Sequence, residues 1–299
     1  MSSHPTALSD ALGVTLPSPL QRITDERLAK AGVTLYLKRD DLISPFVPGN
    51  KWRKLKYNLL QAKQDGHTTL LTFGGAYSNH LRAVAAAGKL CGFTTIGIVR
   101  GEPHRPLNWS LAYTQEYDMK LVYLDRDTYR HDKTKPTFLQ TLCARYGSFY
   151  LLPEGGSNAL ALRGCQEIVD EITVPFDIIC CGVGTGGTIA GIAAKLLGQQ
   201  QVLGFASLKG GDFLNADVAR LQQLALGKPT KNWSINTDYH CGGFAKKNPQ
   251  LDTFITDFYQ RHGLQLEQVY VAKMMYGLFD LIQRGSLQDT TIIAVITGS

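Results

Sequence analysis

The chain has 299 residues, of which 44% are hydrophobic and 19% are charged, and its formal net charge is +6. This length allows one large or two medium-sized domains, and the composition is typical of a globular enzyme. No apolar run approaches the roughly 20 residues that a membrane helix requires, so a membrane protein is not expected.

Apolar, β-rich runs alternate with segments of helical periodicity along the chain. We predict strands at residues 35–38, 69–73, 95–99, 120–124, 149–152, 176–181, 202–207 and 291–296. We predict helices at residues 50–64, 79–90, 107–116, 137–146, 160–171, 187–197 and 272–284. Such alternation indicates an α/β fold with parallel sheets that are covered on both faces. The turn-rich run at residues 153–158 is expected to separate two lobes.

The distribution of charges and cysteines indicates which ligands to expect and in which compartment. Basic residues cluster only around Lys51, Arg53, Lys54 and Lys56, without the dense aromatic-interleaved stripe that is typical of nucleic-acid binding. We therefore expect a small anionic ligand and no nucleic acid. The six cysteines form no C-x-x-C pair, so no metal is expected. Reduced thiols and the lack of a secretory signal pattern favour a cytoplasmic location.

A glycine-rich loop joins the strand at 176–181 to the helix at 187–197. It contains Gly182, Gly184, Thr185, Gly186, Gly187 and Thr188. The N-terminus of a helix presents free N–H groups and the positive end of its dipole, and glycines let the backbone approach a ligand closely. The loop therefore predicts a phosphate site.

The same glycines allow two other interpretations. They match the G-x-G-x-x-G pattern of dinucleotide-binding proteins, but that pattern requires an acidic residue at the end of the next strand. The first acidic residue after that strand is Asp212, so the acidic residue that would hydrogen-bond the ribose is missing at the expected position. A tight turn that binds no ligand is the other alternative.

Lys51 follows Gly49 and Asn50 at the predicted start of a helix. Most lysines are solvated surface charges, but this position is unfavourable for a cation because the helix dipole is positive there. An amine that forms an imine or lies near an anion explains the position better. Neighbouring cations lower the pKa of such an amine, and we expect Arg53 and Lys54 to supply that field.

Ser78, Asn79 and His80 begin the next predicted helix. The simplest interpretation is an N-cap that satisfies free N–H groups. A compatible functional interpretation adds a substrate carboxylate at those N–H groups, with the Ser78 hydroxyl facing it. His80 is either a proton carrier or a polar helix residue.

Five ordered motifs resemble the 1-aminocyclopropane-1-carboxylate deaminase/D-cysteine desulfhydrase family of pyridoxal-phosphate enzymes. They span nearly the whole chain, at residues 49–55, 74–80, 155–158, 184–188 and 273–277. The resemblance implies the two-lobed, parallel-sheet tryptophan synthase β-type fold. It implies a large cofactor-binding domain (1–51 plus 161–299), a small domain (52–160) and a homodimer.

The resemblance also implies roles for individual residues. Lys51 would bond covalently to pyridoxal 5'-phosphate, and Asn79 would hydrogen-bond the ring oxygen. The phosphate would be held by Lys54, Gly184, Thr185, Gly186, Gly187 and Thr188, with Thr297 near the ring nitrogen. Lys51, Ser78 and Tyr270 would be catalytic, and Ser78, Asn79, His80 and Tyr77 would bind the substrate.

The chain departs from the family pattern at two places. Val271 stands where the deaminases carry a glutamate and the desulfhydrases a threonine, and Phe244 stands where a second catalytic tyrosine is usual. Tyr77 is a candidate to supply, near the site, the hydroxyl group that is lost with phenylalanine at position 244. These losses disfavour opening of a cyclopropane ring, so we expect a pyridoxal-phosphate-dependent lyase that acts on a small amino acid as D-cysteine desulfhydrase does.

In that reaction Lys51 removes the α-proton and thiolate leaves, giving pyruvate, ammonia and sulfide. The alternatives are a 1-aminocyclopropane-1-carboxylate deaminase, a racemase or another β-eliminating specificity, and a cofactor-binding protein with little catalysis.

Overall fold

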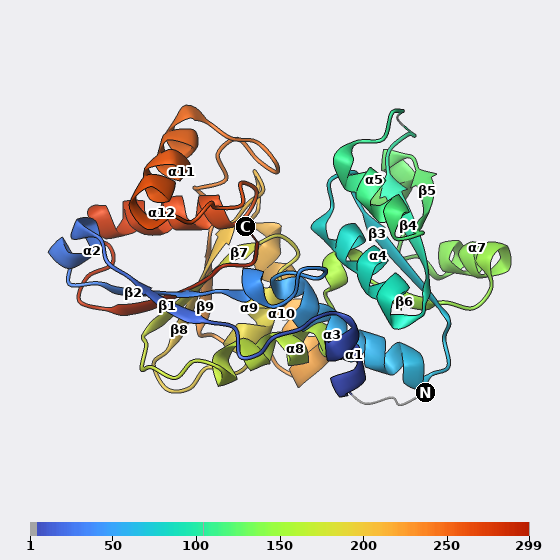
Figure 1. The fold of residues 1–299 in the computed structure, drawn as a ribbon, viewed down its shortest axis with the longest axis horizontal. Coiled ribbons are helices and arrows are strands. Elements are labelled where there is room, and N and C mark those ends of the chain that lie inside the picture. Colours follow the sequence, from blue (N-terminus) through green and yellow to red (C-terminus); the bar gives the residue numbers. More distant parts are fainter. Residues whose placement is uncertain (1–4, 104, 299) are drawn as a thin grey trace.

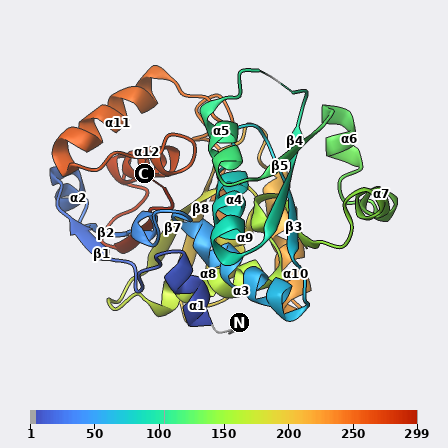
Figure 2. The same cartoon turned by 45° about the vertical axis from the view of Figure 1, so that its right-hand side comes forward.

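The computed structural model describes residues 5–103 and 105–298, which form two sheets flanked by helices (Figures 1 and 2). The larger sheet has the strand order β1-β2-β10-β7-β8-β9. Its strands are β1 (Leu20–Ile23), β2 (Thr34–Lys38), β7 (Ile178–Val183), β8 (Gln201–Ala206), β9 (Trp233–Asn236) and β10 (Thr291–Val295). Its described pairings are parallel except that of β1 with β2.

The smaller sheet is parallel throughout its described pairings and has the order β5-β4-β3-β6. Its strands are β3 (Thr69–Gly74), β4 (Thr94–Arg100), β5 (Lys120–Leu124) and β6 (Tyr150–Leu152). The two sheets with their helices lie side by side in Figure 1. The proposed domain boundaries, after residues 51 and 160, stay a prediction.

The helices are α1 (Pro5–Ala11), α2 (Glu26–Lys30), α3 (Asn50–Gln64), α4 (Asn79–Cys91), α5 (Trp109–Glu116), α6 (Arg126–His131), α7 (Pro136–Tyr146), α8 (Ala159–Asp170), α9 (Gly187–Ala193), α10 (Phe213–Leu226), α11 (Pro249–His262) and α12 (Val271–Gln283). Single 3-10 turns lie at Asp40–Leu42 and Glu154–Gly156. None of the helices in the described ranges is both long and apolar enough to cross a membrane.

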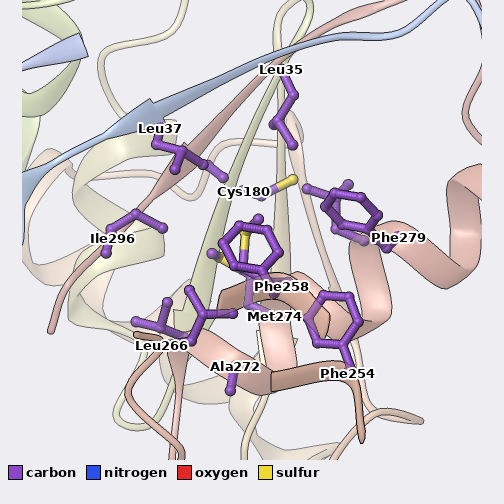
Figure 3. Close-up of a cluster of buried hydrophobic side chains, with 14 of the residues drawn as sticks. Leu35, Leu37, Cys180, Phe254, Phe258, Leu266, Ala272, Met274, Phe279 and Ile296 are labelled. Carbon is purple, nitrogen blue, oxygen red and sulfur yellow. The ribbon is translucent and has the colours of Figure 1, made fainter. Parts of the chain in front are cut away.

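Both faces of the larger sheet are buried, as the alternation of the sequence predicts. Cys180 of β7 joins a cluster that includes Phe258, Met274 and Phe279 from α11 and α12 (Figure 3). Its neighbours Ile179 and Cys181 point to the opposite cluster, which is formed with α8, α9 and α10. Cys180 and Cys181 are both buried, and neither forms a disulfide.

Helix α3 packs against β3 and α4, which belong with the smaller sheet, and against α8, which covers the larger sheet. Its apolar residues Trp52, Leu55 and Leu59 are fully buried in the cluster that also contains residues of β3 and α4. On another side, Lys56 binds Glu167 of α8, with Lys56 Nζ 2.7 Å from Glu167 Oε1. The helix that carries Lys51 is therefore fixed by its surroundings on more than one face.

The predicted strands and helices are found with shifts of a few residues at their ends. The largest difference is α9, which ends at Ala193 rather than at residue 197. The elements that were not predicted from the sequence are α1, α2, α6, α10, α11, β1 and β9. The antiparallel strand β1 reads Leu-Gln-Arg-Ile with only Ile23 buried, so its short sequence shows no alternation of apolar and polar residues.

Candidate functional site

The predicted site residues lie where parallel strands end, which is where α/β sheets bind ligands. The glycine loop follows β7, Ser78 and Asn79 follow β3, and Thr297 follows β10. Gly49, just before α3, has a φ of 65° and lies so close to Thr297 that a Cβ there would be 1.8 Å from the Thr297 carbonyl oxygen. Glycine is therefore required for the lysine helix to begin against the end of β10.

Lys51 lies in the first turn of α3, as predicted. Its Nζ donates to Oδ1 of Asn50 at 2.7 Å, and Nδ2 of Asn50 donates to Oγ1 of Thr188 at 2.9 Å. Asn50 thus connects the lysine to the helix after the glycine loop. Burial, together with the positive charges of Lys54 and Arg82, lowers the pKa of Lys51 to about 7. A substantial fraction of this amine is neutral, and so nucleophilic, at neutral pH.

This lowered pKa predicts how the reactivity of Lys51 depends on pH. In the cofactor-free protein, acylation of residue 51 by an amine-reactive reagent should rise with pH, reach half its maximum near pH 7, and level off above about pH 8, because the neutral amine is the nucleophile. Mass spectrometry of peptides labelled at a series of pH values measures this directly. The exposed Lys89 serves as the internal control for the activity of the reagent at each pH. Labelling of Lys51 that reaches half its maximum well above pH 8 would contradict the assignment.

Lys54 lies one turn further along α3 and faces the glycine loop. Its Nζ donates to the Gly155 carbonyl oxygen at 3.1 Å and to Ser157 Oγ at 3.2 Å, and no described carboxylate forms an ion pair with it. Burial lowers the pKa of Lys54. A buried ammonium without an acidic partner is suited to a ligand that brings its own negative charge.

The glycine loop approaches this ammonium closely. A Cβ at Gly187 would lie 2.5 Å from Ser157 Oγ and 3.2 Å from Lys54 Nζ, and Ser157 Oγ is itself 2.7 Å from Thr185 Oγ1. The N-terminal residue of α9, two threonine or serine hydroxyls and one lysine therefore converge at one point. These are the donors that a phosphate group binds.

Ser78 caps α4, as the simpler interpretation predicts: its Oγ accepts the Leu81 N–H at 3.2 Å. Asn79 begins the helix and accepts a hydrogen bond from Arg82 at its Oδ1. Tyr77, just before the cap, is 55% exposed. All three follow the end of β3, but none of them forms a hydrogen bond with the Lys51 amine in the described part of the chain.

His80 is buried, and its Nε2 lies 2.8 Å from Thr72 Oγ1. Burial and the charges of Lys51 and Lys54 keep the pKa of His80 well below its usual value, so the imidazole is neutral. Its Cε1 packs against Gly156, where an added Cβ would approach it to 3.0 Å. The structure thus places His80 behind the turn at residues 154–158, and its role as a substrate ligand stays a prediction.

Tyr270 precedes α12 and its ring covers part of the glycine loop. A Cβ at Gly184 would lie 2.9 Å from Tyr270 Cε1 and 3.0 Å from its hydroxyl oxygen. Burial raises the pKa of Tyr270, so the phenol keeps its proton. The ring of Phe244 packs edge-on against that of Tyr270, with centroids 5.9 Å apart.

Three residues of the site region were not identified from the sequence. Glu267 accepts the backbone N–H groups of Val269, Tyr270 and Val271 at 2.9, 2.8 and 3.3 Å, which fixes the start of α12. Asn50 and Ser157 link the two lysines to the phosphate loop. Both lie within the recognised motifs at residues 49–55 and 155–158, where they were given no role, and only the fold brings them to Thr188 and Thr185.

Arg53 does not act as the sequence suggested. Its guanidinium is fully buried and binds Asp40 at 3.0 Å and Glu171 at 2.8 Å, so two carboxylates neutralise it. The charge that lowers the pKa of Lys51 comes from Lys54, as predicted, and from Arg82. Arg53 instead anchors α3 to the turn after β2 and to the end of α8.

Comparisons with known proteins agree with this site. The family described as "Pyridoxal-phosphate dependent enzyme" matches residues 12–298. A Thermotoga maritima protein provisionally named 1-aminocyclopropane-1-carboxylate deaminase is 29% identical over 297 residues, covering 94% of this chain and 93% of the relative. A D-cysteine desulfhydrase of Yersinia enterocolitica is 27% identical over 314 residues, covering 97% and 92%.

Among solved structures, one described as an ACC deaminase homologue superposes with a TM-score of 0.85 and 26% identity, covering 99% of this chain and 95% of the other. This match confirms the two-lobed tryptophan synthase β-type fold that the motifs implied. Because this family matches almost the whole length of the chain, the chain belongs to the pyridoxal-phosphate dependent enzymes, and its cofactor is pyridoxal 5'-phosphate.

Proposed function

We propose that this enzyme is a lyase that eliminates the β-substituent of a small amino acid, as D-cysteine desulfhydrase does. The observation that carries the proposal is the Lys51 amine, which is buried beside the phosphate site and has a pKa of about 7. A base whose pKa lies near the working pH is best suited to remove a proton from carbon. The D-cysteine desulfhydrase of Yersinia enterocolitica, 27% identical, supports this reaction class.

The residues fit the cofactor at both of its ends. Lys51 supplies the amine for its aldehyde, while Lys54, Thr185, Thr188 and the backbone of residues 184–188 supply donors for its phosphate. We assign the contact with the ring oxygen to Asn79 and that with the ring nitrogen to Thr297. When bound, pyridoxal phosphate withdraws electrons from the Cα–H bond of the attached amino acid.

The remaining steps belong to side chains of this protein. Lys51 would take the α-proton at its Nζ. Ser78 Oγ already accepts the Leu81 N–H, so its own proton is free for the substrate carboxylate. Burial keeps the phenolic proton on Tyr270, and we assign to this residue the donation of that proton to the leaving group. With D-cysteine and one water, the products are pyruvate, ammonia and hydrogen sulfide.

The alternative substrate is 1-aminocyclopropane-1-carboxylate, which is supported by the 29% identity to the Thermotoga maritima relative. This substrate has no α-hydrogen, so the basic Lys51 would have to act on the ring carbons. Val271 is buried and apolar, and Phe244 has no hydroxyl, which leaves Tyr270 as the phenol at this position. We therefore rank ring opening second, and cofactor binding with little catalysis third.

A substrate screen separates these candidates. The purified protein with its cofactor is incubated with D- and L-cysteine, D- and L-serine and the cyclopropane amino acid, and sulfide, keto acid and ammonia are assayed separately. We expect sulfide, pyruvate and ammonia in equal amounts from D-cysteine. Keto acid and ammonia from the cyclopropane substrate, with no sulfide from either cysteine, would establish the alternative. Bound cofactor without any product would favour the third candidate.

We also propose that the enzyme works in the cytoplasm as a homodimer. Free thiols support a reducing compartment, because all six cysteines of the described chain are unpaired. Light scattering of the purified protein tests the dimer, and a monomeric mass at working concentrations would reject it.

A further inference from the structure

Arg82 lies one turn into α4, beside the site, and lacks an acidic partner. Its Nη2 donates to Asn79 Oδ1, and its guanidinium lies over the ring of Trp109, with Cζ 4.3 Å from the ring centroid. Its buried Nε has no hydrogen-bond partner among the described residues, and no described carboxylate forms an ion pair with it. Burial lowers the pKa of Arg82, and its charge in turn lowers the pKa of Lys51.

The contact with Asn79 determines which way the amide group of that side chain faces. A guanidinium has only donors, so the atom that meets it must be the amide oxygen. The two N–H groups on Nδ2 therefore face away from Arg82, and no described residue accepts a hydrogen bond from them. Stacking on the Trp109 ring fixes the orientation of the Arg82 guanidinium. The guanidinium in turn fixes the orientation of the Asn79 side-chain amide through their hydrogen bond.

We propose that Arg82 is a positioning residue that presents the N–H groups of Asn79 to the ring oxygen of pyridoxal phosphate. The inference rests on the proposed function, because it takes Asn79 as the ligand of that oxygen. An anionic ring oxygen needs a donor, and an amide turned by 180° would place its own oxygen there instead. Without Arg82 the amide loses the hydrogen bond that favours this orientation, and the donor faces the ring oxygen in only a minor fraction of the molecules.

A double-mutant cycle tests the coupling without any turnover. The dissociation constant of pyridoxal phosphate and the position of its visible absorption band are measured for Arg82→Met, Asn79→Ala and the double variant. We expect each single change to weaken binding about tenfold and to shift the band, since each removes one charge-assisted hydrogen bond or its orientation. The double variant should bind within about twofold of Asn79→Ala alone, because the two residues act as a unit.

Two conservative variants and one control make the result specific. Asn79→Asp still accepts from Arg82 but has no donor, so it should lose affinity as Asn79→Ala does. Arg82→Lys keeps a donor and a charge, so it should restore the band and most of the affinity, and it keeps the test available should Arg82→Met not fold. Lys89→Met removes an exposed cation from the same helix and should bind the cofactor as the native protein does.

The outcomes separate two kinds of failure. Single effects that multiply in the double variant, or an Arg82→Met protein that binds normally while Asn79→Ala does not, would overturn the positioning role alone. Normal binding by both Asn79 variants would reject Asn79 as a cofactor ligand and with it this inference. Covalent labelling away from Lys51 would instead count against the proposed function itself.

Discussion

Replacing Lys51 with alanine is expected to lower kcat for the best substrate by about a thousandfold or more, because both the attachment amine and the general base are lost. Steady-state assays of keto acid release measure the change. In the native protein, borohydride reduction followed by peptide mapping should place the reduced cofactor on residue 51, between Asn50 and Trp52.

The matched control is Lys56→Ala, five residues along the same helix. Lys56 binds Glu167 on α8, with its Nζ 2.7 and 3.0 Å from the two carboxylate oxygens, so it has no role in the proposed chemistry. Its loss should leave kcat near that of the native enzyme. A Lys51→Ala enzyme with native kcat, or a reduced label on another lysine, would remove the basis of the proposed mechanism.

Replacing Arg53 with methionine is expected to lower the free energy of unfolding by about 3–5 kcal/mol, because the buried Asp40 and the partly buried Glu171 are left without this cation. Arg53 and the Asp40 side chain are fully buried, and their closest ion-pair distance is 3.0 Å. Lys38 stays with Glu171 at 2.7 Å, which places the expected loss toward the lower end of the range. Urea unfolding followed by circular dichroism measures it.

Lys195→Met provides the comparison for this variant. Lys195 pairs with Asp170 at 2.8 Å, but the two side chains are 45% and 49% exposed, so no measurable change is expected. Equal losses in the free energy of unfolding for the two variants would show that the buried ion pairs of Arg53 stabilise the fold no more than an exposed ion pair does.

Glu171 also makes the stability depend on pH. Although burial alone would raise the pKa of Glu171, its hydrogen bonds with Arg53 and Lys38 lower that pKa to about 2. The stability contributed by this group is therefore present above about pH 4.5 and lost as the pH falls through 2.

The sequence was informative where several local signals agreed. The glycine loop was bounded by an apolar strand and an alanine-rich helix, so its position at the end of β7 could be predicted. Lys51 was conspicuous because a cation at a helix start needs an explanation, and the structure shows that burial lowers its pKa to about 7. The alternation of strands with helices along the chain also indicated sheets that are covered on both faces, and the residues of β7 and β10 do pack into clusters on the two faces.

Other features depend on contacts between distant residues and could not be read from local patterns. Arg53 looked like one more cation near Lys51, because nothing nearby in the sequence shows that Glu171 lies 118 positions away and next to it in space. Likewise, Arg82 had no local signal, since its role depends on Trp109 in another helix. Helix α11 did carry a signal, an Asn248 cap followed by Pro249, that went unused.

The tight packing of α3 has a consequence for how this scaffold changes over generations. Eight of its residues, from Asn50 to Ala62, are buried, so most mutations in the helix that bears Lys51 carry a high risk of misfolding. The exposed aromatic residues Tyr77 and Phe244 lie on turns instead, where substitution is tolerated. Evolvability is thus concentrated at Tyr77 and Phe244, and a mutational library that seeks new selectivity is best confined to these two positions.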